Sequence, residues 1–338
     1  MVQSLHPHKG PFASELHPGD LPTGFYLCRH KRLEPFRDRS KGKFLTLILS
    51  DRTGQILARV WEGAEELAGE FEQGAVVKVS GEVEEYLGRR QVIIHRLRAA
   101  RDTEFDLRDF LPASQKDPAE LSAALEEAVN RISDSHLSAL VRHFYDDPGF
   151  TEQLRQAPAS SRIHHAYLGG LLEHLVEVVR LAEAALELYP GLDADLLRAG
   201  VLLHDVGKLR DFARQTDIRY SDEGRLIGYV VAGEEMVAWA IRGIPTFPEE
   251  LALRIRHMMV SQRGKFEYGS PRRPMTLEAL ALHKLDDLSV QVNRFQTLLA
   301  RPYEPGATWS EFDRRLGHSL FLGVGNEDLP EEVIGDEI

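Results

Sequence analysis

The 338-residue chain contains one cysteine, Cys28, so it cannot form an internal disulfide, and this favours a reducing compartment. No apolar run approaches the roughly 18 residues of a membrane-spanning helix, and the first residues do not follow a signal-peptide pattern. These absences argue against a disulfide-stabilised secreted protein and against a membrane protein. The sequence therefore predicts a soluble cytoplasmic protein, and its 43% of hydrophobic residues is ordinary for a globular core.

Positive charge is also scarce, since 41 Lys and Arg face 53 Asp and Glu for a formal net charge of −12. The segment 21–100 departs from this balance, with 14 basic and 11 acidic residues and a net charge of +3, which leaves −15 for the remainder. An acidic remainder argues against non-specific binding of duplex nucleic acid there. The contrast divides the chain into two parts.

The segment 21–100 has the short apolar runs and turn signals of a β-domain. Five strands are predicted, at 24–33, 43–50, 55–61, 75–83 and 89–94. A turn at 51–54 joins the second strand to the third, residues 62–70 form a short helix, and Leu87 and Gly88 connect the last two strands. This order matches a five-stranded OB-fold β-barrel.

Basic residues in this part concentrate around Phe36, on the first strand and in the loop that follows it. They are Arg29, Lys31, Arg32, Arg37, Arg39, Lys41 and Lys43. A positive groove with an aromatic ring for base stacking is how OB-folds hold single strands. We therefore predict that Phe36 and these basic residues bind single-stranded RNA or DNA; a solvated loop is the alternative.

The most informative stretch is a His-Asp pair at the end of an apolar run, in the segment LHDVGK at residues 203–208. Apolar residues from Ala199 to Leu203 predict a buried helix, and Gly207 permits the helix to end after the pair. An imidazole nitrogen beside a carboxylate oxygen suits a divalent cation such as Mn²⁺, Fe²⁺, Mg²⁺ or Zn²⁺. Most His-Asp dipeptides are surface pairs, but one that closes a buried helix indicates a metal site.

Two side chains do not hold a catalytic metal, so further ligands are expected from other helices. His174 shares the apolar face of a predicted helix that begins near residue 171, although a core histidine bonded to a carbonyl is the alternative. Asp286 lies on the edge of another apolar face, where an unpartnered carboxylate would be costly; Asp287 is the competing choice. The predicted metal ligands are His174, His204, Asp205 and Asp286.

The order and spacing of these four residues resemble the HD-domain metal-dependent phosphohydrolases. The surrounding segments are similar to the YhaM-type 3′→5′ exoribonucleases: HHAYLGGLLEH at 164–174, LHDVGK at 203–208, FEYGSP at 266–271 and EALALH at 278–283. The resemblance runs from about residue 20 to about residue 295. It implies an N-terminal OB-fold followed by an all-α HD domain, and a metal-dependent phosphodiesterase that acts as a 3′→5′ exonuclease on single-stranded RNA, with DNA as an alternative substrate.

The sequence departs from this family where histidines serve a second ion. Tyr229 stands at one such position, and Gln262 and Arg263 stand where a histidine pair is expected, whereas His257 is kept. We therefore expect one ion per chain, with Mn²⁺ as the first choice and Mg²⁺, Fe²⁺ or Zn²⁺ as alternatives. Two other functions stay open: a one-metal HD nucleotide phosphohydrolase, and a catalytically silent protein that binds nucleic acid or a nucleotide.

Under the active interpretation, the metal activates water and polarises a phosphoryl oxygen. Asp205 would ligate the metal and orient the attacking water, and Lys208 would stabilise phosphate charge; its alternative is a surface lysine at a helix C-terminus. His165 and His257 are candidates for substrate contact or for proton delivery to the leaving 3′ oxygen. Arg263 could hold a phosphate oxygen bidentately.

The predicted organisation is multidomain, α and β. It comprises an N-terminal extension at 1–20, the OB-fold at 21–100, a linker at 101–118, the all-α HD domain at 119–325 and a tail at 326–338 with six acids and no base. The expected partner is a single strand of RNA or DNA, without a membrane. A homo-oligomer is compatible with the sequence.

Overall fold

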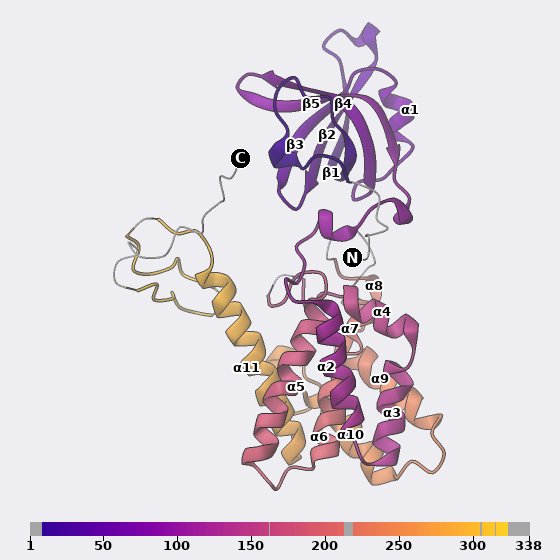
Figure 1. The fold of residues 1–338 in the computed structure, drawn as a ribbon, viewed down its shortest axis with the longest axis vertical. Coiled ribbons are helices and arrows are strands. Elements are labelled where there is room, and N and C mark those ends of the chain that lie inside the picture. Colours follow the sequence, from indigo (N-terminus) through magenta and orange to yellow (C-terminus); the bar gives the residue numbers. More distant parts are fainter. Residues whose placement is uncertain (1–8, 162, 213–218, 305, 315, 324–338) are drawn as a thin grey trace.

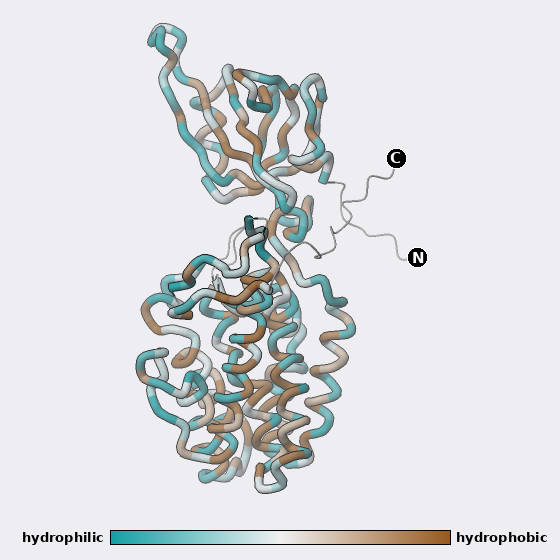
Figure 2. Tube along the Cα trace, turned by 90° about the vertical axis from the view of Figure 1, so that its left-hand side faces the viewer, coloured by the Kyte–Doolittle hydropathy of each residue, from teal (hydrophilic) through white to brown (hydrophobic). Residues whose placement is uncertain are grey.

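The protein is described by a computed structural model over residues 9–161, 163–212, 219–304, 306–314 and 316–323 (Figure 1). A β-barrel unit and a helical bundle follow one another along the long axis of the molecule (Figure 1). Hydrophobic positions concentrate inside the barrel and inside the bundle (Figure 2). The predicted acidic tail at 326–338 lies outside the described residues.

The barrel is formed by five strands and one short helix. These are β1 (Thr23–Pro35), β2 (Lys43–Asp51), β3 (Gly54–Val60), α1 (Ala64–Ala68), β4 (Val76–Tyr86) and β5 (Arg89–Ala99). The strands close in the order β1-β2-β3-β5-β4, and β3 pairs with β5 in parallel while the other pairs are antiparallel. Leu87 and Gly88 have φ of 51° and 72°, the left-handed conformation that a two-residue hairpin between β4 and β5 requires. The OB-fold prediction is confirmed.

Part of the predicted N-terminal extension packs onto the barrel. Lys9 Nζ lies 2.7 Å from Asp51 Oδ2, and both side chains are buried. Asp51 also accepts a hydrogen bond from the backbone N–H of Ala13 at 2.7 Å, and the Tyr26 hydroxyl donates to the carbonyl of Pro11 at 2.7 Å. Residues 9–16 are therefore an integral part of the barrel unit.

The second unit is all-α. Its helices are α2 (Pro118–Asn130), α3 (Ser135–Tyr145), α4 (Pro148–Gln156), α5 (Gly170–Leu188), α6 (Ala194–Leu203), α7 (Lys208–Asp211), α8 (Asp222–Leu226), α9 (Tyr229–Arg242), α10 (Glu249–Ser261) and α11 (Leu277–Leu299). Aspartate side chains accept backbone N–H groups at the starts of α2, α3, α4 and α6, which is why these helices begin where they do. None of the described helices is long and apolar enough to cross a membrane.

The segment between the two units, predicted as a linker, is packed against both. Phe110 is buried with Phe25 and other residues of the barrel, and the N–H of Arg52 donates to the carbonyl of Asp109 at 2.8 Å. Further along, Ser114 N–H donates to the carbonyl of Leu168 at 2.9 Å, in the loop that leads into α5. The segment is thus fixed at both ends.

Candidate metal centre and nucleic-acid interface

Four ligand-type side chains meet inside the helical bundle. His174 lies on α5, His204 and Asp205 follow directly after α6, and Asp286 lies on α11; all four are buried. Asp286 Oδ1 is 3.2 Å from His174 Nε2 and 3.8 Å from His204 Nε2. Asp205 Oδ2 is 3.5 Å and 3.4 Å from the same two nitrogens. The packing of three helices around an apolar core thus brings together residues more than 100 positions apart.

The two histidines are held by their other ring nitrogens. His204 Nδ1 lies 2.7 Å from the carbonyl of Val201, and His174 Nδ1 lies 3.1 Å from Ser289 Oγ. Within the described residues, both Nε2 atoms are buried without a hydrogen-bond partner. Buried polar atoms without partners are rare. Two such nitrogens facing two carboxylates form a donor set that fits a divalent metal ion.

The charges of the cluster favour a cation. Burial alone would raise the pKa of Asp286 and of Asp205, but their histidine neighbours lower both below the usual carboxyl value. Burial would also lower the pKa of His204, yet Asp205 and Asp286 raise it to about 10. The two carboxylates therefore remain charged and attract a proton or a metal to the space between the rings, and metal binding would release that proton.

The turn that carries the His-Asp pair depends on Gly207, for a reason that the sequence did not indicate. Its φ is −64°, a conformation that any residue adopts; α6 ends at Leu203 and α7 begins directly after the glycine. A Cβ at this position would lie 2.0 Å from the carbonyl oxygen of Tyr229 and 2.6 Å from the nitrogen of Gly233. Gly207 is therefore required by the close approach of α9.

Two cationic side chains lie beside the cluster. Lys208 is buried, with its Nζ 2.6 Å from Asp205 Oδ2 and 5.1 Å from the centre of the Tyr229 ring. This burial rules out the alternative of a surface lysine. The Arg263 guanidinium lies beside the Tyr229 hydroxyl. Its electrostatic interaction with Tyr229, followed by the charges of Asp286 and Asp205, raises the pKa of Arg263 above its usual value.

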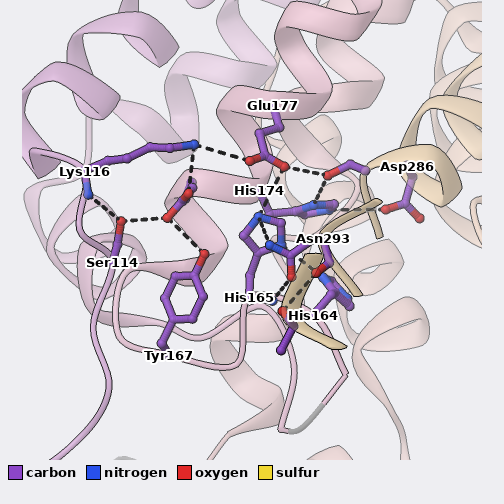
Figure 3. Close-up of polar contacts among 12 residues, drawn as sticks. Ser114, Lys116, His164, His165, Tyr167, His174, Glu177, Asp286 and Asn293 are labelled. Atoms are coloured by element: carbon purple, nitrogen blue, oxygen red, sulfur yellow. Dashed lines mark hydrogen bonds and ion pairs between the residues drawn. The ribbon is translucent and has the colours of Figure 1, made fainter. Parts of the chain in front are cut away.

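The remaining predicted site residues have other surroundings. His165 has a φ of +43° and is buried, and its Nε2 lies 3.2 Å from Glu177 Oε2 (Figure 3). His257 Nε2 accepts a hydrogen bond from the backbone N–H of Met275 at 2.9 Å. Gln262 donates to the carbonyls of His204 and Met259. Its bond to His204 supports the His-Asp turn.

Sequence reasoning missed His164, which lies against the centre. Its ring centroid is 5.2 Å from that of His174, and its Nδ1 lies 3.5 Å from His165 Nδ1. Burial, followed by the positive charge of Lys208, lowers the pKa of His164 well below its usual value, so the ring is neutral. The only sign of this in the sequence was the pair of adjacent histidines at 164–165. The pair does not show which of the two rings faces the metal cluster.

The predicted nucleic-acid residues are spread along β1, the β1–β2 loop and the first residue of β2. Arg37, Arg39 and Lys41 are exposed in the loop. Phe36 belongs to an aromatic group with Phe44 and Trp61, whose ring centroids lie 5.1 to 5.8 Å apart.

The other basic residues of this segment have partners within the barrel. Lys31 Nζ donates to the carbonyl of Ala68 at 2.8 Å. Arg29 Nε donates to Ser50 Oγ at 3.0 Å. Arg32 pairs with Glu34 and Lys43 with Glu65, at 3.5 and 2.8 Å. The loop group of Arg37, Arg39 and Lys41, for which no partner is found among the described residues, is thus distinct from the basic residues that are paired within the barrel.

Two family models match the chain: an OB-fold nucleic acid binding domain over residues 29–100 and an HD domain over residues 171–291. The 3′-5′ exoribonuclease YhaM of Shouchella clausii is 32% identical over 274 residues, which are 81% of this chain and 83% of that protein. The same-named protein of Bacillus licheniformis is 33% identical over 269 residues, 79% and 84% of the two chains.

Among solved structures, the second OB-fold domain of replication protein A from Methanococcus maripaludis is 24% identical, with a TM-score of 0.23, over 27% of this chain and 93% of that domain. The two relatives, by contrast, span both the barrel and the bundle. The predicted resemblance is confirmed, and the chain belongs to the YhaM-type 3′-5′ exoribonuclease family, which joins an OB-fold to an HD domain.

Proposed function

We propose that this protein removes nucleotides from the 3′ end of single-stranded RNA by metal-dependent hydrolysis. The observation that carries the proposal is the buried pair of unpartnered Nε2 atoms, on His174 and His204, facing two carboxylates. The names of the relatives supply the direction of degradation and the class of substrate.

His174, His204, Asp205 and Asp286 would hold the ion. When bound, a divalent ion polarises a phosphoryl oxygen and lowers the pKa of water. The Lys208 ammonium lies 2.6 Å from Asp205 Oδ2, the oxygen that also faces the two rings. Lys208 and Arg263 place positive charge beside the ligands, where it would neutralise the charge that builds up on a phosphate in the transition state.

We propose one ion per chain, with Mn²⁺ as the first choice. The positions expected to serve a second ion are otherwise engaged: the Gln262 amide donates to backbone carbonyls, and Tyr229 interacts with both Lys208 and Arg263. A guanidinium and an ammonium repel a second cation. Elemental analysis of the purified protein should find about one ion per chain, and two well-occupied ions would refute this part of the proposal.

The barrel would supply affinity for the single strand. Phe36, Phe44 and Trp61 offer ring faces on which bases stack, and Arg59 lies 5.4 and 5.5 Å from the ring centres of Phe44 and Trp61. The exposed charges of the β1–β2 loop are next to this group in sequence. RNA is the proposed substrate, and DNA is the comparison.

The test is digestion of a single-stranded RNA, labelled at its 5′ end, by the full-length protein with Mn²⁺. A ladder shortened from the 3′ end is expected, and Asp205→Ala should reduce the rate at least about 10²-fold while leaving strand binding in place. Cleavage of mononucleotides alone would favour the nucleotide phosphohydrolase. Binding without hydrolysis under Mn²⁺, Mg²⁺, Fe²⁺ or Zn²⁺ would favour the silent binding protein.

The proposed location is the cytoplasm, in keeping with a lone cysteine. Cys28 is fully buried, and this burial raises the pKa of its thiol to about 11. A reducing compartment suits such a protein. Self-association stays an option that light scattering measures directly.

A further inference from the structure

We infer that Lys116, in the segment between barrel and bundle, keeps the metal ligand His174 in its metal-binding tautomer by acting through Glu177 and Ser289. The inference rests on the metal centre proposed above. All three are positioning residues, because they act on the ligand and not on the substrate. The contacts that carry it form one continuous path (Figure 3).

The first step is the direction of the hydrogen bonds at Ser289. Its Oγ lies 3.0 Å from Glu177 Oε2 and 3.1 Å from His174 Nδ1. A carboxylate can only accept, so the single hydroxyl hydrogen points to Glu177. The hydroxyl oxygen must then accept from Nδ1–H of His174. A neutral imidazole carries one N–H, and Nε2 therefore keeps the lone pair that a metal needs.

Glu177 must be ionised for the Ser289 hydroxyl to point in this direction. Burial alone would raise the pKa of Glu177, but a hydrogen bond and charge from His165, a hydrogen bond from Ser289 and the charge of Lys116 lower it to about 2. The carboxylate is thus an acceptor at any pH near neutrality.

The second step is the anchoring of Glu177 by Lys116. The Lys116 ammonium lies 3.3 Å from Glu177 Oε1 and 2.8 Å from Glu173 Oε1. Glu173 is itself held through its other oxygen by Ser114 and Tyr167, at 2.6 and 3.0 Å. The group of His165, Glu173 and Glu177 has the spacing of a metal site, but the lysine already supplies its positive charge. Lys116 takes one oxygen of Glu177 and leaves the other to Ser289 and His165.

The third step is the position of Lys116 in the chain. Lys116 and Ser114 belong to the connecting segment, which is tied to the barrel at Asp109 and Phe110 and to the loop before α5 at Leu168. The part of the chain that joins the two units is therefore also part of the support of the metal centre. Displacing the segment would remove the ammonium from Glu177.

The experiment measures Mn²⁺ affinity by calorimetry, and the melting temperature without metal, on full-length variants. Ser289→Ala and Glu177→Gln should weaken Mn²⁺ binding about 10- to 100-fold, the usual effect of losing a partner of a metal-binding histidine. Ser289→Thr keeps the hydroxyl and should bind within about threefold of the wild type. The melting temperature without metal should stay close to that of the wild type, so that the loss of affinity is not caused by unfolding.

Glu177→Gln tests the tautomer of His174. Lys116 would attract the amide oxygen and turn the NH₂ group toward Ser289, so the hydroxyl hydrogen would point to His174 Nδ1 and its ring hydrogen would move to Nε2. Lys116→Met should therefore weaken Mn²⁺ binding in the wild type but cost nothing further in Glu177→Gln, a non-additivity that a double-mutant cycle measures. ¹⁵N shifts of the His174 ring would report the tautomer directly.

Arg131→Met is the matched control. Arg131 also bridges two glutamates, Glu127 and Glu183, and its side chain is 49% exposed, as is that of Lys116, yet its pairs do not lead to the metal ligands. Its Mn²⁺ affinity should equal that of the wild type. The inference is overturned if Ser289→Ala binds Mn²⁺ like the wild type, if Ser289→Thr loses as much as Ser289→Ala, or if Arg131→Met loses as much as Lys116→Met. A wild-type protein that binds no divalent metal would instead refute the proposed metal centre itself.

Discussion

At Lys208, a buried ammonium and a metal ion would compete for the same carboxylate oxygen. Lys208 Nζ lies 2.6 Å from Asp205 Oδ2, the atom that also faces both histidine rings. The lysine would therefore limit metal affinity while it supplies charge for a phosphate. A residue can weaken the binding of a cofactor and still be needed for catalysis.

Lys208→Met should accordingly bind Mn²⁺ more tightly, by about tenfold, which corresponds to roughly 1.4 kcal/mol, and hydrolyse RNA more slowly. Calorimetry and a single-turnover assay measure the two effects. Lys284→Met, at an exposed position on α11, is the control and should change neither. Weaker Mn²⁺ binding by Lys208→Met would show that the ammonium holds Asp205 in place rather than competing for it.

Asp211 should make stability depend on pH. Burial raises its pKa to about 6, and its Oδ1 has no hydrogen-bond partner among the described residues. The unfolded value is about 3.9, so between pH 4 and 6 the folded state binds more protons. The destabilisation caused by this carboxylate therefore appears as the pH rises through this window. Above the window it amounts to roughly 1 to 3 kcal/mol once solvent screening is taken into account.

Asp211→Asn lacks this titration. Urea unfolding should show the variant gaining stability relative to the wild type between pH 4.5 and pH 7.5, by about 1 to 3 kcal/mol. A stability difference that stays constant over this range would mean that Asp211 is ionised in the folded protein throughout.

At the scale of the elements, the His-Asp turn packs closely against the start of α9. Gly207→Ala would push a methyl group against the backbone of Tyr229 and Gly233. We expect a loss of about 1 to 3 kcal/mol in unfolding free energy, with weaker Mn²⁺ binding because the ligands His204 and Asp205 move with the turn. Gly191→Ala, where a Cβ makes ordinary contact, is the control. An unchanged Mn²⁺ affinity would show that the added methyl group does not displace His204 and Asp205.

The sequence predicted elements where one local signal decides the structure. Alternating apolar residues and the Leu87-Gly88 turn indicated the hairpins, and the motif at 203–208 indicated the family. It did not show that Gly207 makes room for α9, because that contact joins positions distant in sequence. Lys116 was assigned to a linker for the same reason: its partners Glu173 and Glu177 are 57 and 61 residues away and become neighbours only when α5 packs.

On the scale of the whole molecule, chemistry and strand affinity are assigned to different units. Changing Arg37, Arg39 and Lys41 to Ala should weaken single-strand binding and lower the salt slope of binding by about two, since each lost phosphate contact contributes about 0.7. Hydrolysis of a dinucleotide should be unaffected. Fluorescence anisotropy at several salt concentrations measures the slope, and an unchanged slope would mean that the loop does not contact the strand.

Cys28 lies in β1, fully buried, with its thiol 3.4 Å from the carbonyl oxygen of His30. A thiol reagent can reach it only while the barrel is open, and the helical bundle has no cysteine at all. The native chain therefore carries its own reporter for one half of the molecule. Its labelling rate measures how often the barrel opens under native conditions. Comparing that rate with and without Mn²⁺ would show whether an ion bound in the helical bundle also makes the barrel open less often.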